Sequence, residues 1–385
     1  MRDNFEQIFA DLIAFPTISA DSNLDLINYV ANQLEGVGAA IELQQDITGN
    51  KANIFATIGE DMPGGIVLSG HADVVPVFDQ TWARNPFLLS ADKDKYYGRG
   101  TCDMKGFIAV VLSMAPLFSE LKLKRPIHFA FTYDEEVGCL GGRELASLLQ
   151  KRPHMPAAAI VGEPTQMKIV DGHKGCCEYT VHFEGLAGHG SMPDRGVNAA
   201  EYAAKFVSKL LELRELLKKR APADSAFDPP WTTINLGRLA GGAVHNVIVS
   251  HAEVDWEMRP VSHFDADWVK STLKEYCEIE LLPAMRAVWP DANITTHTIG
   301  EVLGLEPMAS NAARELVARL TGANDSHLVA FGTEAGLFQQ LGVETIVCGP
   351  GSIEQAHKAD EFIEIAQLEE CQQLIEKLAY SMAEG

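Results

Sequence analysis

Histidines and carboxylates in this sequence follow several of its short apolar runs. They are His71 after 65–69, Glu135 and Glu136 after 127–133, Glu163 after 157–161, and His357 after 344–348. Asp103 instead opens a helical stretch. In open α/β sheets, functional groups gather beyond the carboxyl ends of the strands, so we expect these side chains to lie close together. Imidazole nitrogens and carboxylate oxygens are ligands of zinc, cobalt and manganese, and the pattern therefore predicts a metal site.

A simpler interpretation is available for each residue taken alone. His71 and His357 could be solvated loop histidines, and the acids could be surface charges. At a shared sheet edge, however, two imidazoles and several carboxylates would repel one another or stay unsatisfied unless a cation held them. The joint pattern therefore favours metal binding.

Other catalytic chemistries leave different motifs. The sequence lacks GxxxxGK[ST], a strand-linked GxGxxG, HExxH and GxSxG. His189, Ser191 and Asp194 have the residue types of a nucleophilic triad, but so short a span rarely supplies its geometry. Cys102 and Cys139 neighbour the predicted ligands, and we expect small buried side chains there rather than nucleophiles.

Helical and extended segments alternate around these motifs. Apolar spacing predicts helices over 6–15 and 24–37, the first of them ended by Pro16. The predicted buried strands are 53–58, 65–69, 127–133, 157–161 and 344–348, and the helices between them are 105–121 and 142–150. This order predicts an α/β domain with a mixed sheet and helices on both faces.

A different pattern occupies the middle of the chain. Its elements are a strand at 178–183, a helix at 199–219, strands at 232–239 and 246–258, a helix at 266–282 and a strand at 293–299. We therefore predict a smaller α+β domain over 178–299, inserted into a catalytic domain formed by 1–177 and 300–385.

Composition excludes several functional classes. The 385 residues carry a formal charge of −22 and are 46% hydrophobic, which indicates a folded globular protein and argues against nucleic acid as a partner. The basic run 218–220 more simply ends a helix. No apolar stretch approaches the roughly 20 residues that cross a bilayer, and we expect neither a membrane span nor a secretory signal. Seven cysteines without a CxxC pair suggest reduced thiols and a cytoplasmic protein.

The motifs together resemble those of a known enzyme family. They are Ser69-Gly70-His71-Ala72-Asp73-Val74-Val75-Pro76, Tyr97-Gly98-Arg99-Gly100-Thr101-Cys102-Asp103-Met104-Lys105-Gly106, Asp134-Glu135-Glu136, Gly162-Glu163-Pro164 and Gln355-Ala356-His357. In order and spacing they are similar to the di-metal hydrolases that include acetylornithine deacetylase, succinyl-diaminopimelate desuccinylase, aminoacylase and glutamate carboxypeptidase. The resemblance runs over nearly the whole chain.

Further motifs narrow the resemblance within that family. They are His173-Lys174-Gly175, Gly188-His189, Arg195-Gly196-Val197-Asn198-Ala199, Thr333-Glu334-Ala335 and Gly349-Pro350-Gly351-Ser352-Ile353. They are most similar to members that hydrolyse N2-acetyl-L-ornithine to ornithine and acetate in arginine biosynthesis. The sequence departs from the pattern of those members at Cys176–Cys177 and Val244–His245. Two other activities therefore stay open, that of a succinyl-diaminopimelate desuccinylase and that of a broader N-acyl-amino-acid deacylase that accepts acetylcitrulline.

The resemblance implies that the site binds two divalent ions. These would be Zn²⁺, with Co²⁺ as the alternative. His71 and Glu163 would bind one ion, Glu136 and His357 would bind the other, and Asp103 would bridge the two. A bridging carboxylate suits two cations about 3.5–4 Å apart, because it screens their repulsion.

The resemblance also implies catalytic roles. Asp73 would orient the His71 ring through the nitrogen that faces away from the metal. Glu135 and Glu136, as neighbours in an extended stretch, would point opposite ways, leaving Glu135 free as the general base. His189 would stabilise the tetrahedral oxyanion from the inserted domain of the partner subunit in a homodimer.

Substrate contacts are expected mainly from the inserted domain, which would act as a lid and a dimerisation domain. Arg259, assisted by Asn246, would bind the α-carboxylate of the amino acid, since a guanidinium can do so with two parallel hydrogen bonds. Glu334 would face the δ-ammonium of ornithine. Lys174 and Thr333 complete the expected substrate contacts by motif similarity.

Overall fold

The computed structural model describes residues 2–78, 80–329 and 331–384 and divides into two compact units. Unit 1 takes the chain up to Gly172, Pro307–Leu328 and the residues from Thr333 onward, and unit 2 takes His173–Glu306 and Val329–Gly332. The chain passes from one unit to the other at 172/173 and 306/307, a few residues away from the predicted domain boundaries at 177/178 and 299/300. The His173 N–H donates to the Leu305 carbonyl at 3.0 Å. This hydrogen bond joins the first residues of unit 2 to the segment that leads back to unit 1.

Unit 1 is an α/β structure. Its helices are α1 (Arg2–Ala14), α2 (Leu24–Glu35), α3 (Lys105–Glu120), α4 (Leu140–Leu149), α8 (Ala312–Thr321), α9 (Ala335–Gln340) and α10 (Ile365–Glu384). Its main strands are β1 (Ala40–Gln45), β2 (Ala52–Ile58), β3 (Ile66–His71), β6 (Ile127–Thr132), β7 (Ala158–Pro164), β8 (Val170–His173), β15 (His327–Val329) and β16 (Glu344–Gly349). A small separate sheet holds β4 (Ser90–Asp92), β5 (Lys95–Tyr97) and β17 (Phe362–Glu364).

The main sheet has the strand order β1-β2-β6-β3-β7-β16-β8-β15. Strands β6, β3, β7 and β16 run parallel to one another, whereas β1 pairs antiparallel with β2, β2 with β6, and β8 with β16. The expected mixed α/β sheet is therefore confirmed. Because β3, β6, β7 and β16 are parallel, their carboxyl ends lie at one edge, where the predicted ligands follow them.

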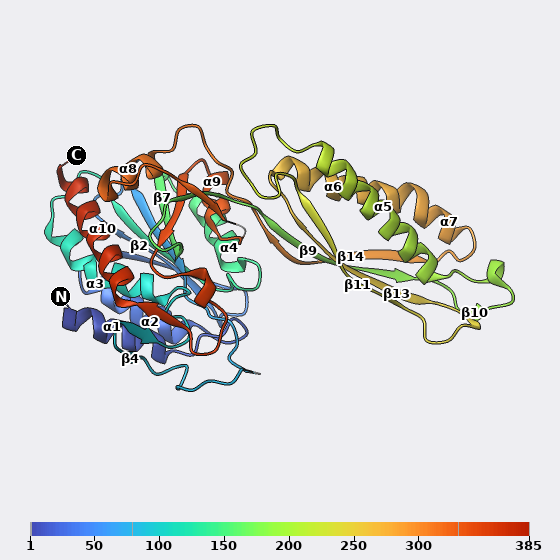
Figure 1. Ribbon diagram of the computed structural model, residues 1–385, viewed down its shortest axis with the longest axis horizontal. Helices are drawn as coiled ribbons and strands as arrows, with labels where there is room; N and C mark the ends of the chain where they lie inside the picture. Colours follow the sequence, from blue (N-terminus) through green and yellow to red (C-terminus); the bar gives the residue numbers. More distant parts are fainter. Residues whose placement is uncertain (1, 79, 330, 385) are drawn as a thin grey trace. The chain divides into compact units, whose positions relative to one another are not determined.

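Helices cover both faces of this sheet (Figure 1). Helices α3, α8 and α10 pack on one face and α4 and α9 on the other. Every residue of β2, β3, β6 and β7 is buried, which accounts for the continuous apolar runs that predicted them. Burial on both faces makes this sheet a rigid support for the side chains at its edge.

Unit 2 is an α+β structure built on a four-stranded antiparallel sheet. Its elements are β9 (Cys176–Glu184), α5 (Ala199–Lys219), β11 (Thr233–Gly241), β13 (His251–Arg259), α6 (His263–Tyr276), α7 (Leu282–Arg286) and β14 (Asn293–Val302). The strand order is β11-β13-β9-β14. Alternate residues of β9 are buried against α5, which leaves the other face of the sheet uncovered by the helices of this unit.

Two details of unit 2 differ from the expectations. The predicted strand 246–258 is interrupted: β12 (Val247–Ile248) pairs with β10 (Gly188–His189), and β13 starts only at His251. The predicted helix 266–282 starts earlier, at His263, and continues through a π-helical turn, Cys277–Leu281, into α7. Across the described part of the chain, no helix is both long enough and apolar enough to cross a membrane.

Candidate active site

His71 ends strand β3 with a fixed ring orientation. The side chain is 1% exposed, and its Nδ1 lies 2.9 Å from the backbone carbonyl of Asp73. The Asp73 carboxylate, which was expected to hold this nitrogen, lies farther away at 3.5 Å. Because Nδ1 donates to the carbonyl, Nε2 is left with a lone pair that can bind a metal.

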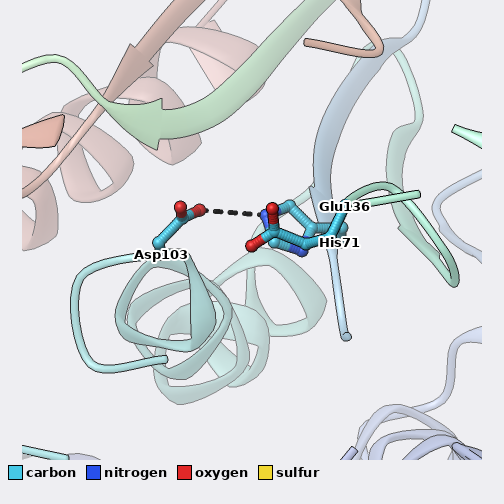
Figure 2. Close-up of side chains that lie close together, drawn as sticks. All are labelled: His71, Asp103 and Glu136. Carbon is cyan, nitrogen blue, oxygen red and sulfur yellow. Dashed lines mark hydrogen bonds and ion pairs between the residues drawn. The ribbon is translucent and has the colours of Figure 1, made fainter. Parts of the chain in front are cut away.

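Asp103 lies beside two imidazoles. It precedes α3, and its Oδ1 is 3.0 Å from His71 Nε2, the contact drawn as a dashed line in Figure 2. Its Oδ2 is 3.3 Å from His357 Nε2. The two oxygens of one carboxylate thus face two different histidines, which is the arrangement that a bridging ligand requires.

Each histidine has a second carboxylate beside it. Glu163, in β7, places Oε1 3.7 Å from His71 Nε2, and Glu136 places Oε2 3.0 Å from His357 Nε2. The ligand atoms of His71, Asp103 and Glu136 also lie within 4.8 Å of one another. The structure therefore brings together all five residues that the sequence suggested as metal ligands, in two groups that share Asp103.

The spacing of these atoms fits metal coordination. Two ligands that are each 2.0–2.1 Å from a tetrahedral zinc ion are about 3.3 Å apart. The nitrogen–oxygen separations in the cluster run from 3.0 Å (His71 to Asp103) to 3.7 Å (His71 to Glu163). The donor atoms therefore need only small shifts to surround an ion.

The electrostatics of the cluster also favour a cation. Burial, and then the negative charges around it, raise the pKa of Glu163 well above its usual value. Hydrogen bonds to Asp103 and Glu136 raise the pKa of His357 to about 10. The cluster thus retains protons to offset its negative charge, and divalent cations would take over that role while releasing them.

Glu135 and Glu136 lie in a turn rather than in the expected extended stretch. The turn starts at Asp134, a non-glycine residue with a left-handed φ of 54°, and the Glu135 carbonyl accepts the N–H groups of Gly138 and Cys139. As a result, both carboxylates face the cluster, Glu135 beside His71 and Glu163. The prediction that they point opposite ways was wrong, because it assumed strand geometry where the chain turns.

Glu135 is nevertheless distinguished from its neighbour by its surroundings. Burial, followed by the charge of Glu136, raises the pKa of Glu135 to about 8. The Cys139 thiol lies 3.5 Å from Glu135 Oε1 and is itself buried, in line with a small buried side chain. Glu135 is thus a buried carboxylate beside the predicted metal ligands, which is the position that a residue exchanging protons with substrate or water requires.

Two predicted residues of unit 2 lie beyond one end of its four-stranded sheet, in or next to the two-stranded pair of β10 and β12. The strand pairing of β10 with β12 sets His189 opposite Val247, next to Asn246, whose carbonyl accepts the Gly190 N–H at 2.8 Å. Both side chains are exposed. The His189 Nδ1 accepts the Ser191 backbone N–H at 3.2 Å, so the neutral ring carries its proton on Nε2.

Arg259 ends β13 at the opposite end of the four-stranded sheet, and Lys174 lies just before β9 at that same end. Met258 pairs with Cys177 and His251 pairs with Glu184, so the two ends are separated by seven residues of β9, or about 23 Å. Figure 1 shows β10 beyond the end of the sheet opposite the start of β9. Asn246 therefore cannot assist Arg259 within the same subunit, and the predicted assistance stays a prediction for residues of two different subunits.

The remaining predicted substrate contacts already have protein partners. Arg259 Nη2 is 2.9 Å from Glu257 Oε2, and Lys174 Nζ donates to the carbonyls of Pro229 and Trp231. Thr333 is fully buried and its hydroxyl accepts the Ala335 N–H at the start of α9.

Glu334 is buried inside unit 1. It is 1% exposed, and its two oxygens accept hydrogen bonds from the hydroxyls of Ser69 at 2.5 Å and Thr132 at 2.7 Å. An ornithine ammonium would have to reach a side chain that is closed off from solvent. We therefore keep Glu334 out of the substrate contacts proposed below.

Several residues that support the site were not predicted. Lys51 donates to both oxygens of Asp134 at 2.6 Å and so holds the turn that carries Glu135. Arg99 and Glu361 form a buried ion pair beside Asp103. These contacts join segments far apart in the sequence, so no local spacing could reveal them. Arg99 does lie within one of the motifs on which the resemblance to the family rests.

Comparisons with known proteins agree with this site. The model of peptidase family M20/M25/M40 matches residues 67–381. Acetylornithine deacetylase of Shigella sonnei (strain Ss046) is 36% identical over 378 residues, which cover 96% of each chain.

Two solved structures share the fold at low identity. The metallo-carboxypeptidase Sso-CP2 of Sulfolobus solfataricus superposes with a TM-score of 0.75 at 18% identity, covering 100% of both chains. The aminopeptidase PepT of Bacillus cereus gives a TM-score of 0.72 at 18% identity and covers 100% of this chain and 99% of its own. With the family match and the clustered ligands, these findings make the chain a hydrolase of peptidase family M20/M25/M40.

Proposed function

We propose that the protein hydrolyses N2-acetyl-L-ornithine to L-ornithine and acetate, as a cytoplasmic enzyme of arginine biosynthesis. The observation that carries this proposal is the 36% identity, over 96% of both chains, to an acetylornithine deacetylase. The site adds chemical support, because Asp103 lies beside both His71, which is near Glu163, and His357, which is near Glu136, with Glu135 as a separate acidic residue.

We assign the five ligands to two divalent ions, Zn²⁺ or Co²⁺. His71 and Glu163 would hold one ion, His357 and Glu136 would hold the other, and Asp103 would contribute to both. When bound, such a pair of ions polarises the amide carbonyl, lowers the pKa of water and offsets the charge that develops on oxygen.

Glu135 moves the proton in this proposal. Its carboxylate accepts a proton from the attacking water as the new C–O bond forms at the acetyl carbonyl. It returns that proton to the amine nitrogen as the C–N bond breaks, so acetate and the free amino group leave. The support for this role is the position of Glu135 beside His71 and Glu163, two of the proposed metal ligands.

His189 supplies a hydrogen bond to the oxyanion. Its Nδ1 already accepts the Ser191 N–H, so Nε2–H is the group that can donate. Arg259 lies at one end of the four-stranded sheet and His189 lies in the two-stranded pair beyond the other end, with about 23 Å of β9 between those two ends. We therefore propose a homodimer in which each active site takes Arg259 from one subunit and His189, with Asn246, from the other.

Arg259 binds the α-carboxylate of the substrate in this proposal. Its guanidinium is 35% exposed and pairs with Glu257, which keeps it charged and oriented. A planar substrate carboxylate would bind it with two parallel hydrogen bonds. We assign no substrate contact to Lys174, whose ammonium is already bonded to two carbonyls.

A kinetic comparison of four substrates tests the proposal. We expect the highest kcat/KM for acetylornithine over acetylcitrulline, acetylmethionine and succinyl-diaminopimelate, in a sample whose metal content is measured. Preference for the succinyl compound would replace the proposed substrate and retain the catalytic residues. Cleavage of dipeptides without release of acetate would overturn the deacetylase assignment.

A further inference from the structure

A buried ion pair lies under the Asp103 loop. Arg99 Nη1 donates to Glu361 Oε2 at 2.7 Å, and both side chains are 1% exposed. Taking two charges out of water is costly unless further hydrogen bonds satisfy them. The bonds that surround this pair therefore indicate what it holds in place.

Glu361 also accepts three backbone N–H groups. Gly100 donates to Oε2 at 3.1 Å, and Cys102 and Asp103 donate to Oε1 at 2.8 and 3.1 Å. The carboxylate therefore fixes the backbone of the loop up to and including Asp103. The Asp103 side chain is left free to face the two histidines.

Arg99 extends this network toward His357. Its Nη2 donates to Gln80 Oε1 at 2.9 Å, and Gln80 Nε2 in turn donates to the His357 carbonyl at 2.8 Å. Glu361 lies only four residues after His357 in the chain. One connected set of hydrogen bonds thus runs from the Asp103 N–H, through Glu361, Arg99 and Gln80, to the carbonyl of His357.

We infer that Glu361 is a positioning residue for the metal pair, which acts with Arg99 and Gln80 to hold Asp103 and His357 at the separation that lets them share an ion. This inference rests on the ligand assignment of the proposed function. Glu361 itself bonds to the backbone of the Asp103 loop and to Arg99, so it works through the ligands and not by touching substrate. A carboxylate is required because all four of its partners are donors.

The variant Glu361→Gln tests this directly. Its amide would turn an NH₂ group toward donors, either Arg99 and Gly100 or Cys102 and Asp103. The measurement is a Zn²⁺ titration of the metal-free protein in competition with a chromophoric chelator, which yields an association constant for each of the two sites. We expect the variant to lower the association constant of the weaker site about tenfold or more. We also expect kcat for acetylornithine to fall while KM stays within about twofold, because no substrate-binding residue is altered.

Asp171→Asn is the matched control. Asp171 is also a buried carboxylate of unit 1 that accepts from an arginine, Arg314, and from a hydroxyl, Ser326, both at 2.8 Å. It has no hydrogen bond to a ligand-bearing loop among those described. We expect this variant to lower thermal stability and leave both zinc constants unchanged.

Gln80→Ala provides a second test that leaves the Arg99–Glu361 salt bridge itself in place. It removes the hydrogen bond from Arg99 to Gln80 and the one from Gln80 to the His357 carbonyl, and it should weaken the same zinc constant by about fivefold. Wild-type zinc constants in folded Glu361→Gln or in Gln80→Ala would overturn the inference, as would an equal loss in Asp171→Asn. Wild-type protein that binds no zinc would instead overturn the proposed function on which the inference rests.

Discussion

The Asp73 carboxylate accepts the backbone N–H of Glu135 through Oδ1, at 3.1 Å. Its Oδ2 accepts the N–H of Glu136 at 3.3 Å and the hydroxyl of Ser19 at 2.7 Å. Asp73 therefore holds the turn that presents both the proposed base and a metal ligand, in addition to lying beside His71. This role is broader than the expected orientation of one imidazole ring.

Replacing Asp73 by Asn should disturb both carboxylates at once. The amide offers one acceptor where the carboxylate offers two, so one of the two backbone N–H groups loses its partner. We expect kcat to fall about 10- to 100-fold with weaker metal binding, measured by steady-state kinetics and metal analysis. Ser19→Ala removes only the hydroxyl and should lose less than the Asp73 variant; equal losses would contradict the proposed role.

Glu135→Gln and Glu136→Gln should separate catalysis from metal binding. The first removes the proposed proton acceptor and should lower kcat by roughly 10²- to 10⁴-fold with two ions still bound. The second removes a proposed ligand and should lower the bound metal itself. Metal content and turnover measured on the same samples decide this, and near-normal turnover in Glu135→Gln would rule out Glu135 as the base.

Mixed dimers should reveal whether His189 serves the partner's active site. Subunits carrying His189→Ala and Glu135→Gln are each expected to be inactive as homodimers. If they are mixed and exchanged, a mixed dimer combines the intact Glu135 of one subunit with the intact His189 of the other. At equal amounts, about a quarter of the wild-type activity should return. Absence of any recovery in verified mixed dimers would show that His189 serves its own subunit.

Arg259→Lys should raise KM for substrates that carry a free α-carboxylate and leave KM for substrates without one nearly unchanged. Lysine keeps the charge but cannot form two parallel hydrogen bonds, so KM for acetylornithine should rise about tenfold or more. The analogue in which that carboxylate is amidated should change little. Glu257→Gln, which releases Arg259 from its present partner, provides the control for loss of the ion pair alone. Equal changes for both substrates would count against direct recognition of the carboxylate.

Stability should fall in mild acid because of His128. Burial, aided by the charge of Arg152, lowers the pKa of His128 to about 4, below the value near 6.5 expected in the unfolded chain. Between these values the unfolded state binds more protons, so unfolding becomes easier as the pH falls from about 6.5 toward 4. From pH 7.5 to 5.0 this residue alone should cost about 2 kcal/mol.

His128→Asn tests this by urea unfolding of the metal-free protein at both pH values. The Asn amide can still bond the Thr57 hydroxyl, which lies 2.9 Å from His128 Nδ1, but it does not titrate. We expect the variant to lack about 2 kcal/mol of the acid-induced loss seen in the wild type. The same pH dependence in both proteins would show that His128 is not responsible.

The sequence determined the parts of this protein that depend on local pattern. Continuous apolar runs predicted β2, β3, β6, β7 and β16, because a strand buried on both faces must be apolar throughout. The residues that follow these strands predicted the metal ligands, since parallel strands end at one edge. Short strands such as β4, β5 and β17, three residues each, gave no such signal.

Tertiary structure alone decided how the predicted residues are arranged. A left-handed Asp134, held by Lys51, turns both Glu135 and Glu136 toward the cluster. Strand pairing places Arg259 at one end of the four-stranded sheet and Asn246 next to the two-stranded pair beyond the other end. Glu361 reaches Asp103 across 258 residues of chain. Such contacts depend on the packing of distant segments, whereas the pattern of residues along the chain reports only on what each segment buries and where it ends.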